Sequence, residues 1–176
     1  MIHGKKLFWA NQHGATAVEF ALISLPMIML IVGVLELAMF YARATVLESA
    51  TTAAARVIRT GEAQNSTNAQ TLFEQTLCAQ VSMVIACDDL IYEVIRPNSD
   101  DFATASNLAP TFDSDGNLIS GGFSAGDMSD VVVVRTAYRY HFATPFLGPI
   151  LGGGQGNSKL MMATTTMRNE PYDFEN

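Results

Sequence analysis

The sequence predicts an α+β protein, in which a long N-terminal helix crosses a membrane and continues into a domain with a second helix and a small, mostly antiparallel sheet. The first observation is a mainly apolar stretch of about 28 residues near the N-terminus, since a helix needs about 20 residues to cross a bilayer. The second is the helical spacing of the apolar residues that follow. The third is a set of strand-like segments, rich in Val, Tyr and Thr, that come after both helices.

Composition narrows the class of protein further. The 176 residues are 49% hydrophobic and only 15% charged, with a formal net charge of −7. An acidic chain has no electrostatic means of gathering phosphate backbones, so nucleic acid is not expected as a partner. Two cysteines are too few for a disulfide scaffold or a four-thiolate zinc site, although they can form one bridge.

The apolar stretch predicts a transmembrane helix over residues 15–41. No charge interrupts residues 20–35. Lys5 and Lys6 precede the stretch, which favours an N-terminus in the cytoplasm and the remaining chain across the membrane. A secretory signal cleaved within residues 41–44 is the alternative, but the apolar core is too long for a typical signal.

Three residues of this helix are unusual for a membrane span. Pro26 removes one backbone hydrogen bond and is expected to kink the helix. Glu19 and Glu36 lie about 25 Å apart along a helix and cannot pair within it. A carboxylate in a membrane is a candidate functional residue, although both can also lie at the two interfaces. Glu36 is therefore an intramembrane acid of unknown role.

The residues before the span resemble the site that prepilin peptidases recognise. In those substrates a basic leader ends in Gly, and the mature chain carries Glu at its fifth position, followed by Phe. By this resemblance residues 1–14 are a leader ending at Gly14, Ala15 is the new N-terminus, and Glu19 and Phe20 are the fifth and sixth residues. A freed amino group at a hydrophobic position needs a counter-charge, which Glu19 can supply to its own or a neighbouring helix.

The wider sequence is similar to the TadE-like family of the Flp/Tad type IV pilus system of bacteria. Residues 14–22, Pro26 and Glu36 carry this resemblance at the N-terminus. Three C-terminal segments agree with it, at residues 130–135, 144–147 and 167–172.

This resemblance implies a pilin-like fold and a minor pilin or pseudopilin in pilus assembly, with a role in adhesion. It implies a single-pass protein of the bacterial inner membrane with its C-terminal domain in the periplasm or in the pilus. The implied partners are the prepilin peptidase, other pilin-like subunits and pilus assembly proteins.

The remaining chain predicts the elements of the domain. The first helix is expected to continue over residues 42–62 and to stop near Gly61, so that residues 63–176 form the α+β domain. Cap residues at 65–67 predict a second helix that runs to about Ile85. Strands are expected at 91–95, 131–142 and 159–167. Residues 98–129 and 148–158 are predicted to be long loops, a length that is uncommon without a function.

Cys78 and Cys87 are predicted to form a disulfide. The inferred topology places them in an oxidising compartment, where a bridge across this short loop would contribute about 2.5 kcal/mol. The alternative is a pair of buried reduced thiols.

No catalytic, metal or cofactor site emerges from the sequence, so an enzyme is not expected. Residues 122–126 match the nucleophile-elbow pattern but lead into a strand rather than a helix. Residues 113–117 hint at a calcium loop but lack its later ligands, which favours a turn. The glycines at 152–156 lack the Lys of a phosphate loop, and His3, His13 and His141 are too scattered for a metal site.

Two classes of function remain open. The first is an assembly protein whose helix packs against other pilin-like helices and whose two long loops choose partners. The second is a single-span anchored protein that binds or senses a ligand in its periplasmic domain. The spacing of Gly14 and Glu19 favours the first, because a simple anchor needs neither cleavage before its span nor a carboxylate at mature position five.

Overall fold

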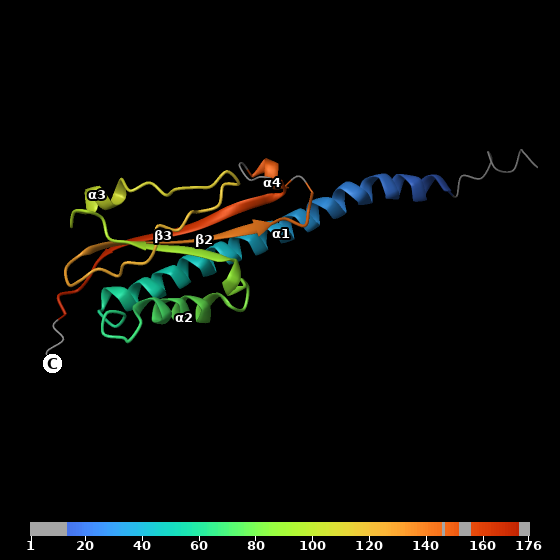
Figure 1. The fold of residues 1–176 in the computed structure, drawn as a ribbon. Coiled ribbons are helices and arrows are strands. Elements are labelled where there is room, and N and C mark those ends of the chain that lie inside the picture. Colours follow the sequence, from blue (N-terminus) through green and yellow to red (C-terminus); the bar gives the residue numbers. More distant parts are fainter. Residues whose placement is uncertain (1–13, 146, 152–155, 173–176) are drawn as a thin grey trace, which may run out of the picture.

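The computed structural model describes residues 14–145, 147–151 and 156–172. The predicted leader therefore lies outside the described residues, apart from Gly14. A long helix, α1 (Ala15–Arg59), runs through the whole molecule and projects from one end of the folded domain (Figure 1). The chain leaves α1 at Thr60, and Gly61 adopts a positive φ of 78°, close to the stop that the sequence predicts.

The three strands form one antiparallel sheet, which confirms the predicted α+β class. They are β1 (Leu90–Ile95), β2 (Val131–His141) and β3 (Ser158–Arg168), in the spatial order β1-β2-β3. The three observed strands lie within one residue of the predicted bounds. The helices α1 and α2 (Ala69–Val81) cover one face of this sheet (Figure 1).

The second helix differs from its predicted bounds at both ends. Its cap is Asn68, whose side chain accepts a hydrogen bond from the N–H of Thr71 at 3.1 Å, so the caps expected at 65–67 are wrong. It ends at Val81 rather than Ile85, because the chain turns there toward β1. A disulfide between Cys78 and Cys87 closes this turn, which confirms the predicted bridge.

The main core lies between the helices and the sheet. On one stripe α1 contributes mostly small and branched side chains, while α2 contributes larger ones and β2 contributes valines. The fully buried members include Leu47, Ala50, Ala54, Ile58, Phe73, Leu77, Val132 and Val134. Because the interior is close-packed, the small residues on α1 allow the helix to approach the sheet more closely than longer side chains would.

The other face of the sheet is covered by the segment that the sequence predicts to be a long loop. This segment contains a short helix, α3 (Phe102–Ser106), and its Ala105 packs with Val131 and Val133. The Arg135 guanidinium forms an ion pair with the Glu93 carboxylate, the one buried pair between strands among the described residues. It also donates to the carbonyl of Leu108, so the same side chain holds this segment against the sheet.

Candidate assembly interface

The first half of α1 stands outside the domain and exposes its apolar side chains. This projecting segment, residues 15–35, is about 31 Å long at 1.5 Å per residue, which matches the hydrocarbon core of a bilayer. Its most apolar window has a mean hydropathy of 2.4, with none of it buried. Phe20 and Leu22 are 70% and 72% exposed. The segment is therefore a candidate transmembrane helix, as the sequence predicts.

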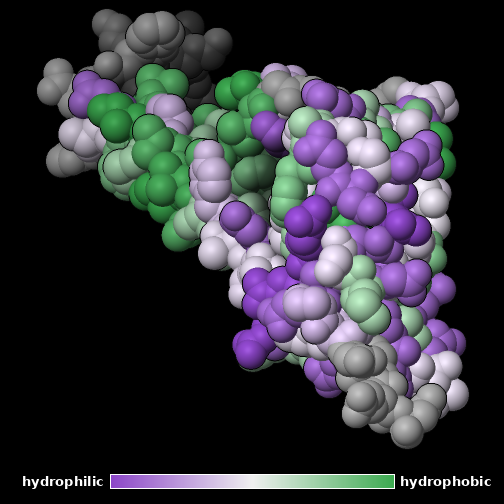
Figure 2. All heavy atoms as spheres, turned by 90° about the vertical axis from the view of Figure 1, so that its left-hand side faces the viewer, coloured by the Kyte–Doolittle hydropathy of each residue, from purple (hydrophilic) through white to green (hydrophobic). Residues whose placement is uncertain are grey.

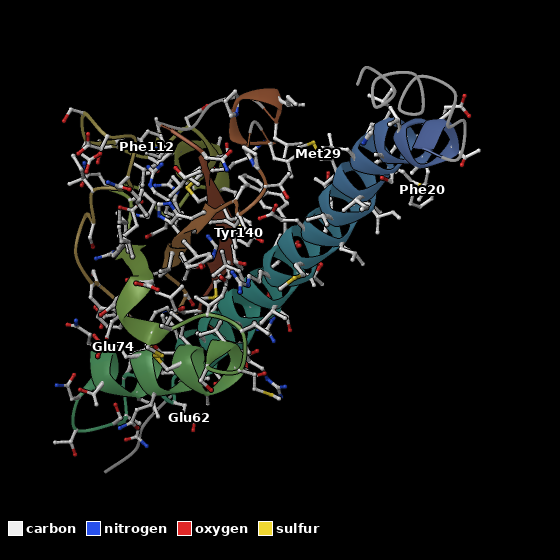
Figure 3. All side chains as sticks on the ribbon, turned by 90° about the vertical axis from the view of Figure 1, so that its right-hand side faces the viewer. Phe20, Met29, Glu62, Glu74, Phe112 and Tyr140 are labelled. Carbon is white, nitrogen blue, oxygen red and sulfur yellow. A yellow bond between two sulfur atoms is a disulfide. The ribbon has the colours of Figure 1, made fainter. Side chains whose placement is uncertain are left out.

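The projecting segment and the domain differ in the hydropathy of their surfaces. Figure 2 shows hydrophobic surface gathered on the projecting helix, while the domain surface is largely polar. In Figure 3, Phe20 extends from α1 clear of the domain. Among the described residues none covers the segment, and an exposed apolar surface of this size marks a site of contact with a membrane or with other proteins.

Gly14 and Glu19, the two residues of the predicted processing site that are most specific, are both exposed. Gly14 caps α1 with a φ of −87°, and a Cβ added to it would meet no atom within 4 Å. The fold therefore gives no steric reason for a glycine at this position. Within the described residues the Glu19 side chain makes no hydrogen bond or ion pair, so its carboxylate is available to a partner.

Glu36 has a different role, which the sequence did not reveal. It is only 7% exposed, and its carboxylate accepts hydrogen bonds from the backbone N–H groups of Ala143 and Thr144, the second at 2.7 Å. These residues follow β2, so Glu36 fastens α1 to the end of the sheet. The only signal available was that Glu36 and residues 144–147 both belong to the segments that carry the family resemblance.

Contacts between α1 and the domain start at Glu36 and continue toward the C-terminal end of the helix. One turn beyond it Phe40 stacks on Phe142 and meets the edge of Tyr140, with ring centroids 5.5 Å apart in both pairs. The predicted span of 15–41 stays a prediction, but its last residues, from Glu36 onward, contact the domain. Pro26 lies inside α1, and the kink expected there also stays a prediction.

At its other end α1 is held by the C-terminal segment. The N–H of Glu170 donates to the carbonyl of Arg59 at 2.9 Å, and their side chains form an ion pair. The three C-terminal segments on which the predicted resemblance also rests thus lie in β2, beside Glu36 and beside Arg59. They hold the second half of α1 in place on the sheet.

The residues considered for catalysis or calcium binding are not assembled into such sites. The backbone of Ser124 bonds to Val94, which pairs with Val134, seven positions and about 23 Å along β2 from His141. The Asp113 carboxylate accepts hydrogen bonds from the N–H groups of Asp115 and Asn117, as a turn requires. His3, His13 and residues 152–155 lie outside the described residues.

Comparison with known proteins gives one match. The family model for TadE-like protein matches residues 14–56 of the chain. No curated protein and no solved structure matches. The match begins at the predicted processing glycine and covers the projecting segment and most of the half of α1 that packs on the domain. The match confirms the predicted TadE-like resemblance over residues 14–56, and the three C-terminal segments that carry the rest of that resemblance lie outside it.

Proposed function

We propose that this protein is a minor pilin or pseudopilin that acts in assembly of a Tad-type pilus, through helix packing and partner contacts rather than catalysis. One observation carries the proposal. The TadE-like match coincides with a helix whose first half is apolar and projects freely, while its second half supplies part of the domain core. A helix built in this way can join a bundle of similar helices without disturbing its own fold.

Processing after Gly14 is the first step of the proposed mechanism. Since the fold does not need a glycine there, its presence fits recognition by a prepilin peptidase. Cleavage would leave Ala15 as the first residue of the helix and Glu19 one turn later. On a helix, residues four apart lie on the same face, so the carboxylate can pair with its own new amino group or with that of a neighbour.

The proposed location is the bacterial inner membrane, with the N-terminus in the cytoplasm and the domain in the periplasm. Lys5 and Lys6 support this orientation, as does the disulfide, which persists in oxidising compartments. The partners proposed are the peptidase, other pilin-like subunits and assembly proteins.

The mature N-terminus, measured by intact mass on protein from its native membrane, tests this proposal. We expect a chain that begins at Ala15 in the wild type and an uncleaved chain in Gly14→Leu. Gly33→Leu is the matched control, because a Cβ at Gly33 also meets no atom within 4 Å, yet Gly33 lies far from the processing site. It should be cleaved normally. A wild-type chain that begins at Met1, or after Ala44, would contradict the proposal.

A further inference from the structure

A small apolar tip lies at the end of the domain from which α1 projects (Figure 1). It comprises residues 145 and 147–151 and contains the short helix α4 (Leu147–Ile150). Leu147 and Leu151 pack toward the core, whereas Ile150 points outward and is 73% exposed. The sequence has no charged residue between His141 and Lys159, so this α4 tip is apolar and uncharged.

The side chains of Asn157 and Lys159 hold the α4 tip in place through hydrogen bonds to its backbone and to Thr144. The Asn157 side chain accepts a hydrogen bond from the N–H of Gly148 at 2.9 Å and donates to the carbonyl of Thr144 at 2.8 Å. The Lys159 ammonium donates to the carbonyl of Leu151 at 2.6 Å. Gly148 lies so close to the chain at Asn157 that an added Cβ would stand 2.8 Å from its Cα. Contacts of this kind fix the direction in which Ile150 is presented.

Glu36 sets the position of the α4 tip relative to a membrane. The projecting segment ends one residue before Glu36 and is about 31 Å long, so Glu36 lies at the surface of the hydrocarbon core if the segment spans it. Because Glu36 bonds to Ala143 and Thr144, the chain that leads directly into the α4 tip lies at the same level.

The surface between the projecting segment and Pro145, the first residue of the α4 tip, is mainly apolar, with Glu36 among its few polar residues. A groove of about 530 Å³ lies there, with Met29 and Val32 on the α1 side and Pro145 on the other. Arg43 and His141 line it as well, on the side of the domain. Apolar residues toward the span and basic or aromatic ones beyond it are the order that a membrane interface favours.

We propose that the α4 tip rests in the interface of the bilayer that α1 spans, with phospholipid as its partner. The continuity of the groove with the span, the absence of charge and the level set by Glu36 carry this inference. It rests on the membrane span of the proposed function. The domain would then have a fixed orientation on the membrane before it joins any assembly.

Tryptophan quenching tests the inference on the full chain in vesicles that contain brominated phospholipid. The single native tryptophan is first replaced, as Trp9→Phe. Three variants then carry one tryptophan each: Ile150→Trp in the α4 tip, Met29→Trp in the projecting segment and Phe102→Trp at the opposite end of the sheet. All three native side chains are 48% to 73% exposed, so the replacements leave the core intact.

We expect Met29→Trp and Ile150→Trp to lose about half of their emission to the brominated lipid, since an interfacial side chain lies roughly 5–10 Å below the surface. Phe102→Trp should be unaffected. Quenching of Met29→Trp without Ile150→Trp would overturn the inference and leave the span intact. Loss of quenching in both would remove the span as well. Protection of Ile150→Trp that rises with the number of chains per vesicle would assign the surface to a second copy and overturn the lipid assignment.

Discussion

Two glutamates on one helix illustrate how environment decides the role of a residue. Glu36 has its carboxylate satisfied by two backbone N–H groups of its own chain, while Glu19 is exposed and has no partner in the described residues. A carboxylate with fixed internal partners serves the fold, because its removal leaves buried donors unpaired. A carboxylate without them, in an apolar segment, is a candidate for pairing with a newly freed amino group or with a partner.

Glu19 is therefore the residue whose loss should separate processing from assembly. We expect Glu19→Ala to be cleaved after Gly14 and to keep its fold, but to fail to join pilin-like partners in co-purification from membranes. Glu48→Ala is the control, since Glu48 is an exposed carboxylate on the same helix beyond the apolar segment. Normal co-purification of Glu19→Ala would refute the charge-pairing role.

Glu36 should instead matter for stability. Hydrogen bonds to a charged group are worth about 1.5–3 kcal/mol, so Glu36→Ala should lower the free energy of unfolding by about 2 kcal/mol. Glu36→Gln keeps one acceptor oxygen and should lose less. Urea unfolding of the detergent-solubilised full chain, followed by circular dichroism, measures both. A cost for Glu36→Ala no larger than that of Glu48→Ala, which should stay within about 0.5 kcal/mol, would show that the contact adds nothing.

At the scale of elements, the turn at residues 113–117 makes a prediction about pH. The side chain of Asn117 donates to the Asp113 carboxylate, and this bond, with the backbone N–H of Asn117, holds the pKa of Asp113 below its ordinary value of 3.8. A depressed pKa means that the carboxylate stabilises the turn above pH 3.8, and that this contribution is lost as the pH falls through the lowered pKa.

Carboxyl NMR titration measures this directly. The Asp113 midpoint should lie below 3.8 in the native chain and return toward 3.8 in Asn117→Ala. Asn107→Ala, in which the lost side chain donates to the carbonyl of Ala103, should leave the midpoint where it was. A native midpoint at or above 3.8 would show that Asn117 does not favour the ionised form.

The elements that could be predicted were those with a long local pattern. α1 and the three strands follow from apolar runs and from Val, Tyr and Thr content. α3 and α4 are too short for a period to be recognised, and the cover of the second sheet face comes from a loop. One signal for that cover was available: four consecutive valines, 131–134, are all buried, and a strand without alternation indicates that both of its faces are covered.

In the candidate site, too, the features that could be predicted are those whose residues are contiguous in the sequence. Gly14, Glu19 and the projecting segment are contiguous in sequence, so their pattern could be read directly. The contact of Glu36 with Ala143 and Thr144 joins residues more than a hundred positions apart, and no local period predicts such a pairing. It depends on where β2 ends once the sheet has packed on α1.

At the scale of the whole molecule, α1 belongs to two environments that meet at Glu36. None of the described residues of its first half belongs to the domain core, whereas its second half supplies part of that core. Leu47 and Ile58 are fully buried, and truncation of a Leu or Ile in a core to Ala costs about 2–5 kcal/mol, against a net stability of about 5–15 kcal/mol for a typical domain. The domain boundary therefore falls inside a continuous helix.

Two truncations test this boundary. A chain that begins at Glu36 should fold into a soluble domain, because it keeps the contact to Thr144 and every buried residue of α1. A chain that begins at Gly61 should lack cooperative unfolding, because the sheet face under α1 is then bare. Thermal unfolding by circular dichroism distinguishes them, and both chains retain the Cys78–Cys87 bridge, so the disulfide cannot explain a difference. A cooperative transition in the shorter chain would show that α1 is an anchor attached to an independent domain rather than part of its core.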